Sequence, residues 1–248
     1  MVLEIVSAVA QLSNRKIDEG QAMNDLVAGF LKFRETGYQE RTELFHQLAH
    51  AQSPGALFIA CSDSRVVPEL LTQQEPGEMF VIRNAGNIVP AYGPEPGGAS
   101  ATVEYAVAVL GVQDVVICGH SDCGAMTAIA KGKDLGHLPA ICNWLHHADT
   151  AKAINARQHF QTEHEKLDAL IRDNVVAQLT NLRTHPSIQL ALSQGKLRLH
   201  GWVYDIETGQ IDALDGATGR FVSLAQYPDA CAVTSASEHA PLALSGRA

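Results

Sequence analysis

The pattern of apolar and polar positions changes its period along the chain. In the first 50 residues, apolar side chains recur every three or four positions, as in NDLVAGFLKF and again in TELFHQLAHA. This period predicts amphipathic helices, each with an apolar face that must be covered. We therefore expect residues 1–50 to form a helical arm that docks either on its own domain or on a partner subunit.

Three short apolar runs follow, and they indicate buried strands. ALFIAC (56–61), MFVIRN (79–84) and DVVICGH (114–120) each come within a few positions of Gly or Pro residues that favour turns. Helical patterns lie between and after them, in residues 97–110 and 123–132. Strands that alternate with helices predict a parallel sheet flanked by helices.

The second half of the chain adds helices and a hairpin. Residues 138–193 are mostly helical in pattern, whereas residues 196–216 alternate and turn at 207–209, which is typical of a hairpin at a sheet edge. The expected fold class is therefore α/β, a mostly parallel central sheet with an antiparallel edge hairpin strand, flanked by helices. This domain spans residues 51–227, and residues 228–248 are expected to form a loose C-terminal tail.

Composition narrows the class of protein. The 248 residues are 46% hydrophobic and 18% charged, which suits a globular core, and the net charge of −9 argues against a nucleic-acid partner. No apolar run approaches the roughly 18 residues that span a bilayer, and the N-terminus lacks the basic start of a signal peptide. Because five cysteines in such a chain favour reduced thiols, we expect a cytoplasmic protein without a membrane partner.

Sulfur and nitrogen ligands for a metal follow two of the predicted strands. Cys61 ends the first strand, His120 ends the third, and Cys123 comes three residues later. The carboxyl ends of parallel strands meet at one edge of a sheet, and zinc prefers this ligand chemistry. A single Cys or His is more often a core residue, so placement rather than spacing favours the site. The other cysteines are expected to be small buried residues: Cys118, Cys142 and Cys231.

Three protein ligands leave one tetrahedral position for water, which is the catalytic pattern. Two thiolates donate more charge than imidazoles, so we expect turnover to rise through mildly alkaline pH. Asp63 and Arg65 lie two and four positions past Cys61. The carboxylate could orient the reactive hydroxide or ligate the zinc, and Arg65 could hold it off the metal through a bidentate pair. The alternative is a surface ion pair of little consequence.

The motif Cys61-x-Asp63-x-Arg65 with His120-x-x-Cys123 resembles the signature of the β-carbonic anhydrases. Flanking segments such as GEMFVIRNAGNIVP and LHGWVYDIETG are similar too, and the resemblance covers residues 25–225. It is closest to bacterial members of the plant-like branch that are associated with cyanate metabolism. It implies one Zn²⁺ per subunit, reversible hydration of carbon dioxide to bicarbonate by zinc-bound hydroxide, and a homodimer or a dimer-based higher oligomer.

The resemblance also implies a substrate site. Gln52 would point at the substrate, Phe80 and Tyr105 would line a small apolar pocket, and the backbone N–H of Gly124 at a helix start would help to hold an anion.

Another branch of the family has a non-catalytic bicarbonate site made of Trp, Arg and Tyr. The corresponding positions are Phe58, Arg83 and Tyr204, so the triad is incomplete and we expect no such site. Two functional alternatives remain at this point. The same fold could hydrolyse carbon disulfide or carbonyl sulfide, or the chain could be a zinc-stabilised binding module without activity. Retention of Asp63 and Arg65 argues against the second alternative.

Overall fold

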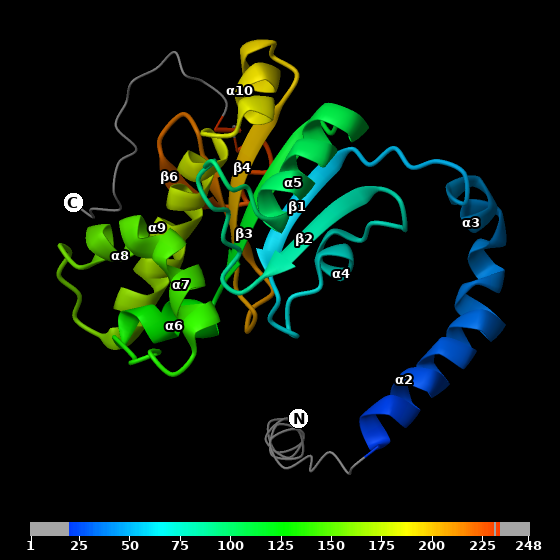
Figure 1. Cartoon of the computed structure of the whole chain (residues 1–248), viewed down its shortest axis with the longest axis horizontal. Helices are drawn as coiled ribbons and strands as arrows, with labels where there is room; N and C mark the ends of the chain where they lie inside the picture. Colours follow the sequence, from blue (N-terminus) through cyan, green and yellow to red (C-terminus); the bar gives the residue numbers. More distant parts are fainter. Residues whose placement is uncertain (1–19, 231, 234–248) are drawn as a thin grey trace. The chain divides into compact units, whose positions relative to one another are not determined.

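The computed structural model describes residues 20–230, 232 and 233 (Figure 1). The chain divides into two compact units, one up to Ala51 and one from Gln52 onward. Among the described residues, no helix combines the length and the apolar character that a membrane crossing requires.

The first unit is helical, as its pattern predicts for the residues that the structure describes. An aromatic cluster packs its bend, because Tyr38 stacks on Phe45 with ring centroids 5.3 Å apart and Phe33 meets Phe45 edge-on at 5.8 Å. The remaining positions of the predicted arm, residues 1–19, lie outside the described residues. The elements are α2 (Gln21–Lys32), a π-type turn (Phe33–Gly37), a 3-10 turn (Gln39–Arg41) and α3 (Thr42–Leu48).

The second unit contains a six-stranded sheet of order β2-β1-β3-β4-β5-β6. The first four strands in this order run parallel, and the β4–β5 and β5–β6 pairings are antiparallel, so the expected fold class is confirmed. The three predicted apolar strands have the bounds that the pattern indicates. The strands are β1 (Ala56–Cys61), β2 (Met79–Asn84), β3 (Asp114–His120), β4 (Arg198–Tyr204), β5 (Ile211–Asp215) and β6 (Arg220–Ser223).

The predicted hairpin is present as β4 and β5, but it is not the sheet edge. A further strand, β6, pairs with β5 and forms that edge. With four residues and no buried side chain, β6 lacks the alternation that would have predicted it.

Helices surround the sheet (Figure 1). They are α4 (Pro68–Thr72), α5 (Gly98–Glu104) with its π-type continuation (Tyr105–Leu110), α6 (Gly124–Ala130), α7 (Pro139–Leu145), a 3-10 turn (His146–Ala148), α8 (Asp149–Asn155), α9 (Glu163–Leu182) and α10 (Pro186–Ser193).

Side-chain alternation in the strands divides the core into two clusters. In β1, Leu57, Ile59 and Cys61 belong to the large cluster, whereas Phe58 and Ala60 belong to the small one. Successive residues of a strand point to opposite faces, so Cys61 lies on the face covered by α9.

Two strand glycines allow α9 to approach the sheet closely. A Cβ added to Gly201 would lie 2.8 Å from Val175 Cγ1, and one added to Gly119 would lie 3.0 Å from Val175 Cγ2. Both are tighter than ordinary contacts, so the helix packs on bare backbone at these positions.

The chain end that the structure describes is fixed to this unit. The Val233 backbone N–H donates to the Leu199 carbonyl at 2.7 Å, and Arg183 Nη2 donates to the Val233 carbonyl at 2.7 Å. The predicted tail is therefore hydrogen-bonded to the second unit at Val233. Its later residues, 234–248, lie outside the described residues.

One buried carboxyl on α9 makes the stability depend on pH. Asp173 is 6% exposed, and its polar neighbour Gln158 donates to Oδ2 at 3.2 Å. Burial raises the pKa of Asp173 to about 6. In the unfolded chain the carboxyl has a pKa of about 3.9. The folded protein therefore holds a proton that the unfolded chain releases, and the free energy of unfolding falls as the pH rises between these values.

We predict that Asp173→Asn stabilises the protein above pH 6, because the amide needs no proton to remain neutral. The gain should be on the order of 2–3 kcal/mol and should shrink to nothing below about pH 4. Urea unfolding of variant and parent at several pH values measures it. Asp168→Asn on the same helix is the matched control, since the Asp168 side chain is 35% exposed. A gain that is equal at all pH values would contradict the assignment.

Candidate metal centre

The sheet order brings the three predicted metal ligands together. β1 and β3 are parallel neighbours, so Cys61 and His120 leave the sheet at the same edge. Cys123 follows three residues later, immediately before α6. One ligand atom of each residue lies within 4.8 Å of the other two, and all three residues are buried. The structure thus brings the three predicted residues into one cluster.

The imidazole of His120 is oriented for a metal. The side chain is 0% exposed, and Nδ1 lies 2.9 Å from the Ser121 carbonyl oxygen. A carbonyl can only accept, so Nδ1 carries the proton and Nε2 presents its lone pair to the cluster. Nε2 is buried without a hydrogen-bond partner. A buried, unpaired acceptor is unfavourable unless a cation occupies the position in front of it.

The two thiols of the cluster influence each other's ionisation. The pKa of Cys61 is lowered, chiefly because its sulfur accepts a hydrogen bond from Cys123, while burial opposes this effect. The pKa of Cys123 is raised, because the neighbouring Cys61 sulfur and burial both disfavour a second negative charge. Both thiols can be ionised together only beside a cation. Two thiolates and one neutral imidazole form a donor set that suits zinc.

The remaining cysteines lie elsewhere. Cys118 is 0% exposed and belongs to the small cluster on the opposite face of the sheet, where burial raises the pKa of its thiol to about 12. It is the small core residue that the sequence predicts. Cys142 on α7 is only half-buried, so the same expectation is wrong there, and Cys231 lies outside the described residues.

Asp63 and Arg65 form the bidentate pair that the sequence predicts. Arg65 Nε donates to Asp63 Oδ1 at 2.9 Å and Nη2 donates to Oδ2 at 2.8 Å, while the Arg65 backbone N–H also donates to Oδ1 at 3.0 Å. These bonds hold the pKa of the Asp63 carboxyl well below its usual range. Asp63 Oδ2 lies 3.9 Å from His120 Nε2. The carboxylate therefore faces the metal cluster and is held beside it by the guanidinium.

Arg83 also holds this loop, and sequence reasoning did not assign it this role. Arg83 at the end of β2 donates from Nε to the Cys61 carbonyl at 3.1 Å and from Nη2 to the Asp63 carbonyl at 2.7 Å. Arg65 Nη2 also donates to the Asp122 carbonyl at 3.2 Å, which joins the two ligand-bearing loops. The signal for Arg83 was its position at the end of a strand next to that of Cys61.

The expected substrate residues divide between the two ends of the sheet. Gly124 opens α6 directly after Cys123. Phe80, in contrast, pairs with Leu57 near the start of β1. Leu57 lies four residues before Cys61, which is roughly 13 Å along the strand. Tyr105 contacts Phe80 with ring centroids 5.9 Å apart and is 44% exposed. Gln52 precedes β1 and lies toward the same end of that strand. Within one chain, only Gly124 adjoins the metal ligands.

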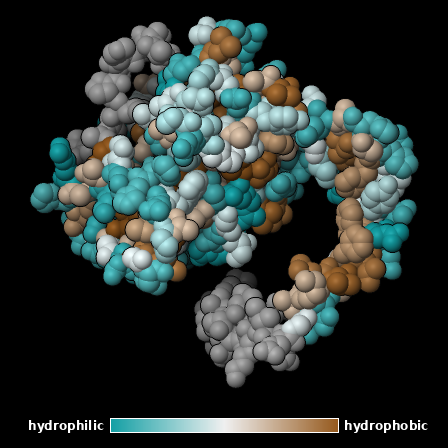
Figure 2. All heavy atoms as spheres, in the orientation of Figure 1, coloured by the Kyte–Doolittle hydropathy of each residue, from teal (hydrophilic) through white to brown (hydrophobic). Residues whose placement is uncertain are grey.

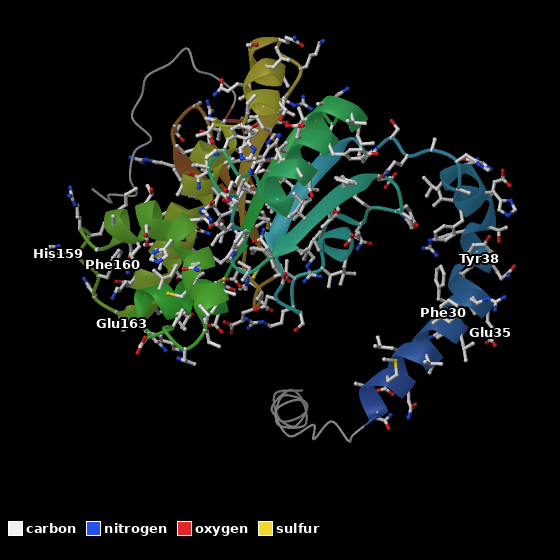
Figure 3. All side chains as sticks on the ribbon, viewed as in Figure 1. Phe30, Glu35, Tyr38, His159, Phe160 and Glu163 are labelled. Carbon is white, nitrogen blue, oxygen red and sulfur yellow. The ribbon has the colours of Figure 1, made fainter. Side chains whose placement is uncertain are left out.

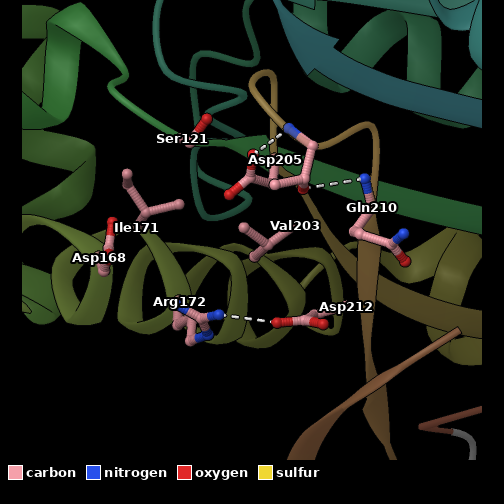
Figure 4. A pocket seen from close by; sticks show the side chains of 9 residues that line it. Ser121, Asp168, Ile171, Arg172, Val203, Asp205, Gln210 and Asp212 are labelled. Carbon is pink, nitrogen blue, oxygen red and sulfur yellow. Dashed lines mark hydrogen bonds and ion pairs between the residues drawn. The ribbon is translucent and has the colours of Figure 1, made fainter.

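A separate polar cavity of ≈ 120 Å³ lies between α9 and the turn from β4 to β5 (Figure 4). Its charged groups include Arg172, which binds Asp212 at 2.8 Å. Ser121, which follows His120 in the chain, reaches the wall of this cavity. Its hydroxyl oxygen accepts a hydrogen bond there from the Ile206 N–H at 2.9 Å. None of the predicted site residues lines this cavity, so it is distinct from the candidate metal centre.

Comparison with known proteins agrees with this geometry. A family model described as carbonic anhydrase matches residues 56–211, which include all three residues of the candidate metal cluster. The chain belongs to the carbonic anhydrase family. A carbonic anhydrase of Pseudomonas aeruginosa is 66% identical over 211 residues, 85% of this chain and 96% of that protein. Carbonic anhydrase 1 of Escherichia coli is 59% identical over 211 residues, with the same coverage.

Solved structures identify the class within the carbonic anhydrase family. The β-carbonic anhydrase CcaA superposes with a TM-score of 0.80 at 43% identity and covers 82% of this chain and 92% of its own. A tetrameric β-carbonic anhydrase of Sordaria macrospora superposes with a TM-score of 0.63 at 30% identity, over 81% of this chain and 98% of its own. This carbonic anhydrase is therefore of the β class.

We predict that Cys123→Ser abolishes stoichiometric binding of a divalent metal, because a hydroxyl replaces one of two thiolate donors. Elemental analysis of the purified protein, with Co²⁺ titration as a second measurement, reports the metal bound per chain. Cys118→Ser is the matched control: it changes a cysteine that is equally buried, on the other face of the sheet. Equal metal content in both variants would exclude Cys123 as a ligand.

Proposed function

We propose that this β-carbonic anhydrase binds one zinc ion per chain through Cys61, His120 and Cys123 and hydrates carbon dioxide reversibly to bicarbonate and a proton. The observation that carries the proposal is the buried cluster of two thiols and one imidazole, with an Arg-bound carboxylate at its edge. When bound, zinc lowers the pKa of a coordinated water, which supplies the nucleophile near neutral pH.

Asp63 orients the attacking water in this proposal. Its carboxyl is ionised, because Arg65 holds its pKa low, and an ionised carboxylate only accepts hydrogen bonds. Oδ2 faces the cluster, so it can accept a hydrogen bond from the water and direct a lone pair of the water at the carbon of carbon dioxide. Arg65 fixes the carboxylate at two points and prevents it from turning onto the metal. Gly124, at the start of α6, adds a backbone donor for the product anion.

A second copy of the chain supplies the remaining substrate residues. The expected roles of Gln52, Phe80 and Tyr105 require them near a metal ion, yet in one chain they lie toward the far end of the sheet. A homodimer that places this end of one chain beside the metal-binding residues of its partner would reconcile the expected roles of these residues with their positions. The non-catalytic bicarbonate site remains an expected absence: Phe58 is buried against Trp202, and Arg83 binds the loop carbonyls.

The first unit offers a surface for such a dimer. Apolar spheres gather along α2 in Figure 2, and Figure 3 labels Phe30 and Tyr38 on this unit. Leu26 is 67% exposed and Phe30 is 57% exposed, although both are large and apolar. An exposed apolar face of this kind is stabilised by burial against another surface. We further assign the protein to the cytosol, because ligation requires reduced thiols at Cys61 and Cys123.

We predict rapid carbon dioxide hydration by the zinc-loaded protein in stopped flow, and a loss of 10- to 100-fold in kcat/KM for Arg65→Ala with zinc content unchanged. The loss follows because Asp63 is then free to turn. Arg198→Ala is the matched control, since Arg198 binds Asp114 in the same bidentate manner but at the other end of the sheet.

Zinc-loaded protein without carbon dioxide hydration would contradict the proposal. Hydrolysis of carbon disulfide or carbonyl sulfide in that sample would favour the sulfur-substrate alternative, and inactivity toward all three would favour a zinc-stabilised binding module.

We predict that the double variant Leu26→Asp and Phe30→Asp dissociates the oligomer, because two charges on the apolar face oppose its burial. Light scattering after size exclusion gives the mass in solution. Gln21→Asp with Ala28→Asp adds the same charge to the opposite face of α2 and should keep the parent mass. Dissociation of both double variants would assign the effect to net charge, and dissociation of neither would remove α2 from the interface.

A further inference from the structure

A buried hydrogen-bond network joins α9 to the loop that follows β2. Asn174 and Gln178 lie one turn apart on α9 and are 1% and 0% exposed. Gln178 Nε2 donates to Asn174 Oδ1 at 2.9 Å, and Gln178 Oε1 accepts from the Val89 N–H at 2.9 Å. Asn174 Nδ2 donates to the Gly86 carbonyl at 3.0 Å. Burying two amides is costly unless their partners are fixed, so this network holds residues 86–89 in one conformation.

The same loop carries a hydrogen-bond donor to a metal ligand. The Gly86 backbone N–H points at Cys61 Sγ with a distance of 3.4 Å. Gly86 has φ +80°, and an added Cβ would lie 3.1 Å from Ala125 and Met126. The position therefore requires glycine both for its backbone conformation and for its close approach to α6.

A tryptophan holds the other end of that peptide group. Trp144 Nε1 donates to the Ala85 carbonyl at 2.8 Å. This carbonyl and the Gly86 N–H belong to one trans peptide, in which they point in opposite directions. The indole on one side thus fixes the peptide plane that aims the N–H at Cys61 on the other side. A hydrogen bond to the carbonyl also polarises the N–H and strengthens it as a donor.

We propose that Trp144 and Asn174 are positioning residues that hold the Gly86 N–H on the sulfur of Cys61 and so limit the charge that this thiolate donates to the metal. This inference rests on the proposed zinc function. A hydrogen bond to a ligand atom lowers its donor strength and leaves the metal a stronger Lewis acid. Neither residue touches the substrate, and each acts through the peptide chain between Ala85 and Ile88.

The test uses the full chain loaded with Co²⁺, whose sulfur-to-metal charge-transfer band reports thiolate donor strength. Trp144→Phe keeps an aromatic ring and removes only the indole donor. We expect its band to move to lower energy and its carbon dioxide hydration to fall about tenfold, the lower end of the effect of outer-sphere partners. Trp202→Phe is the matched control, because the protein has two tryptophans and Trp202 is half-buried like Trp144 but faces the small cluster.

A second variant tests the α9 side of the network. Asn174→Leu removes the donor to Gly86 and leaves no room for a water to replace it, so the band should shift in the same direction. Asn155→Ala controls for loss of a buried amide, since Asn155 is 3% exposed and binds the Lys166 carbonyl instead of the loop. In metal-free protein, the NMR signal of the Gly86 amide proton should move upfield in Trp144→Phe and in Asn174→Leu. It should stay in place in the two controls, Trp202→Phe and Asn155→Ala.

Unshifted bands and an unmoved Gly86 amide in Trp144→Phe and Asn174→Leu would overturn the inference and leave the metal site intact. A parent protein that takes up Co²⁺ without any thiolate band would overturn the proposed metal site, and this inference with it.

Discussion

Two neighbouring buried thiols cannot both lose their protons without a cation between them, and the organisation of the site follows from this constraint. The fold brings the sulfur atoms of Cys61 and Cys123 together without a metal. His120 places an unpaired ring nitrogen beside these two sulfur atoms. A buried thiolate without a cation is unfavourable, and so is the buried, unpaired Nε2 of His120. A divalent cation stabilises both thiolates and partners the imidazole nitrogen, so metal binding and the stability of this region are coupled.

Around this cluster, polar side chains fix backbone groups as well as one another. Arg83 holds the two carbonyls that flank the first ligand loop, and Arg65 links that loop to the one before α6. Trp144 and Asn174 hold the loop that follows β2. Loops at the carboxyl edge of a parallel sheet have few backbone partners of their own, so long side chains from neighbouring elements supply them.

The sequence predicted those parts that depend on local pattern. Continuous apolar runs defined β1, β2 and β3, and strand ends defined the ligand cluster and the Asp63–Arg65 pair, because side chains two residues apart meet within one turn. β6 was missed because four residues without a buried side chain carry no periodic signal. The contact of Asn174 with Gly86 joins positions 88 residues apart, so it depends on how deeply α9 packs, which no local pattern records. The separation of Phe80 from Cys61 follows from strand register, which the pattern constrains only by face.

The depth of α9 depends in turn on the two strand glycines beneath it. Gly119 and Gly201 present bare backbone, and Val175 lies against both of them, next to Asn174. A methyl group at either glycine would raise the helix from the sheet and carry the Asn174 amide with it. The absence of two side chains in the middle of the sheet therefore sets the distance between the Gly86 N–H and the sulfur of Cys61. The dimensions of the metal centre are fixed partly by residues that never contact it.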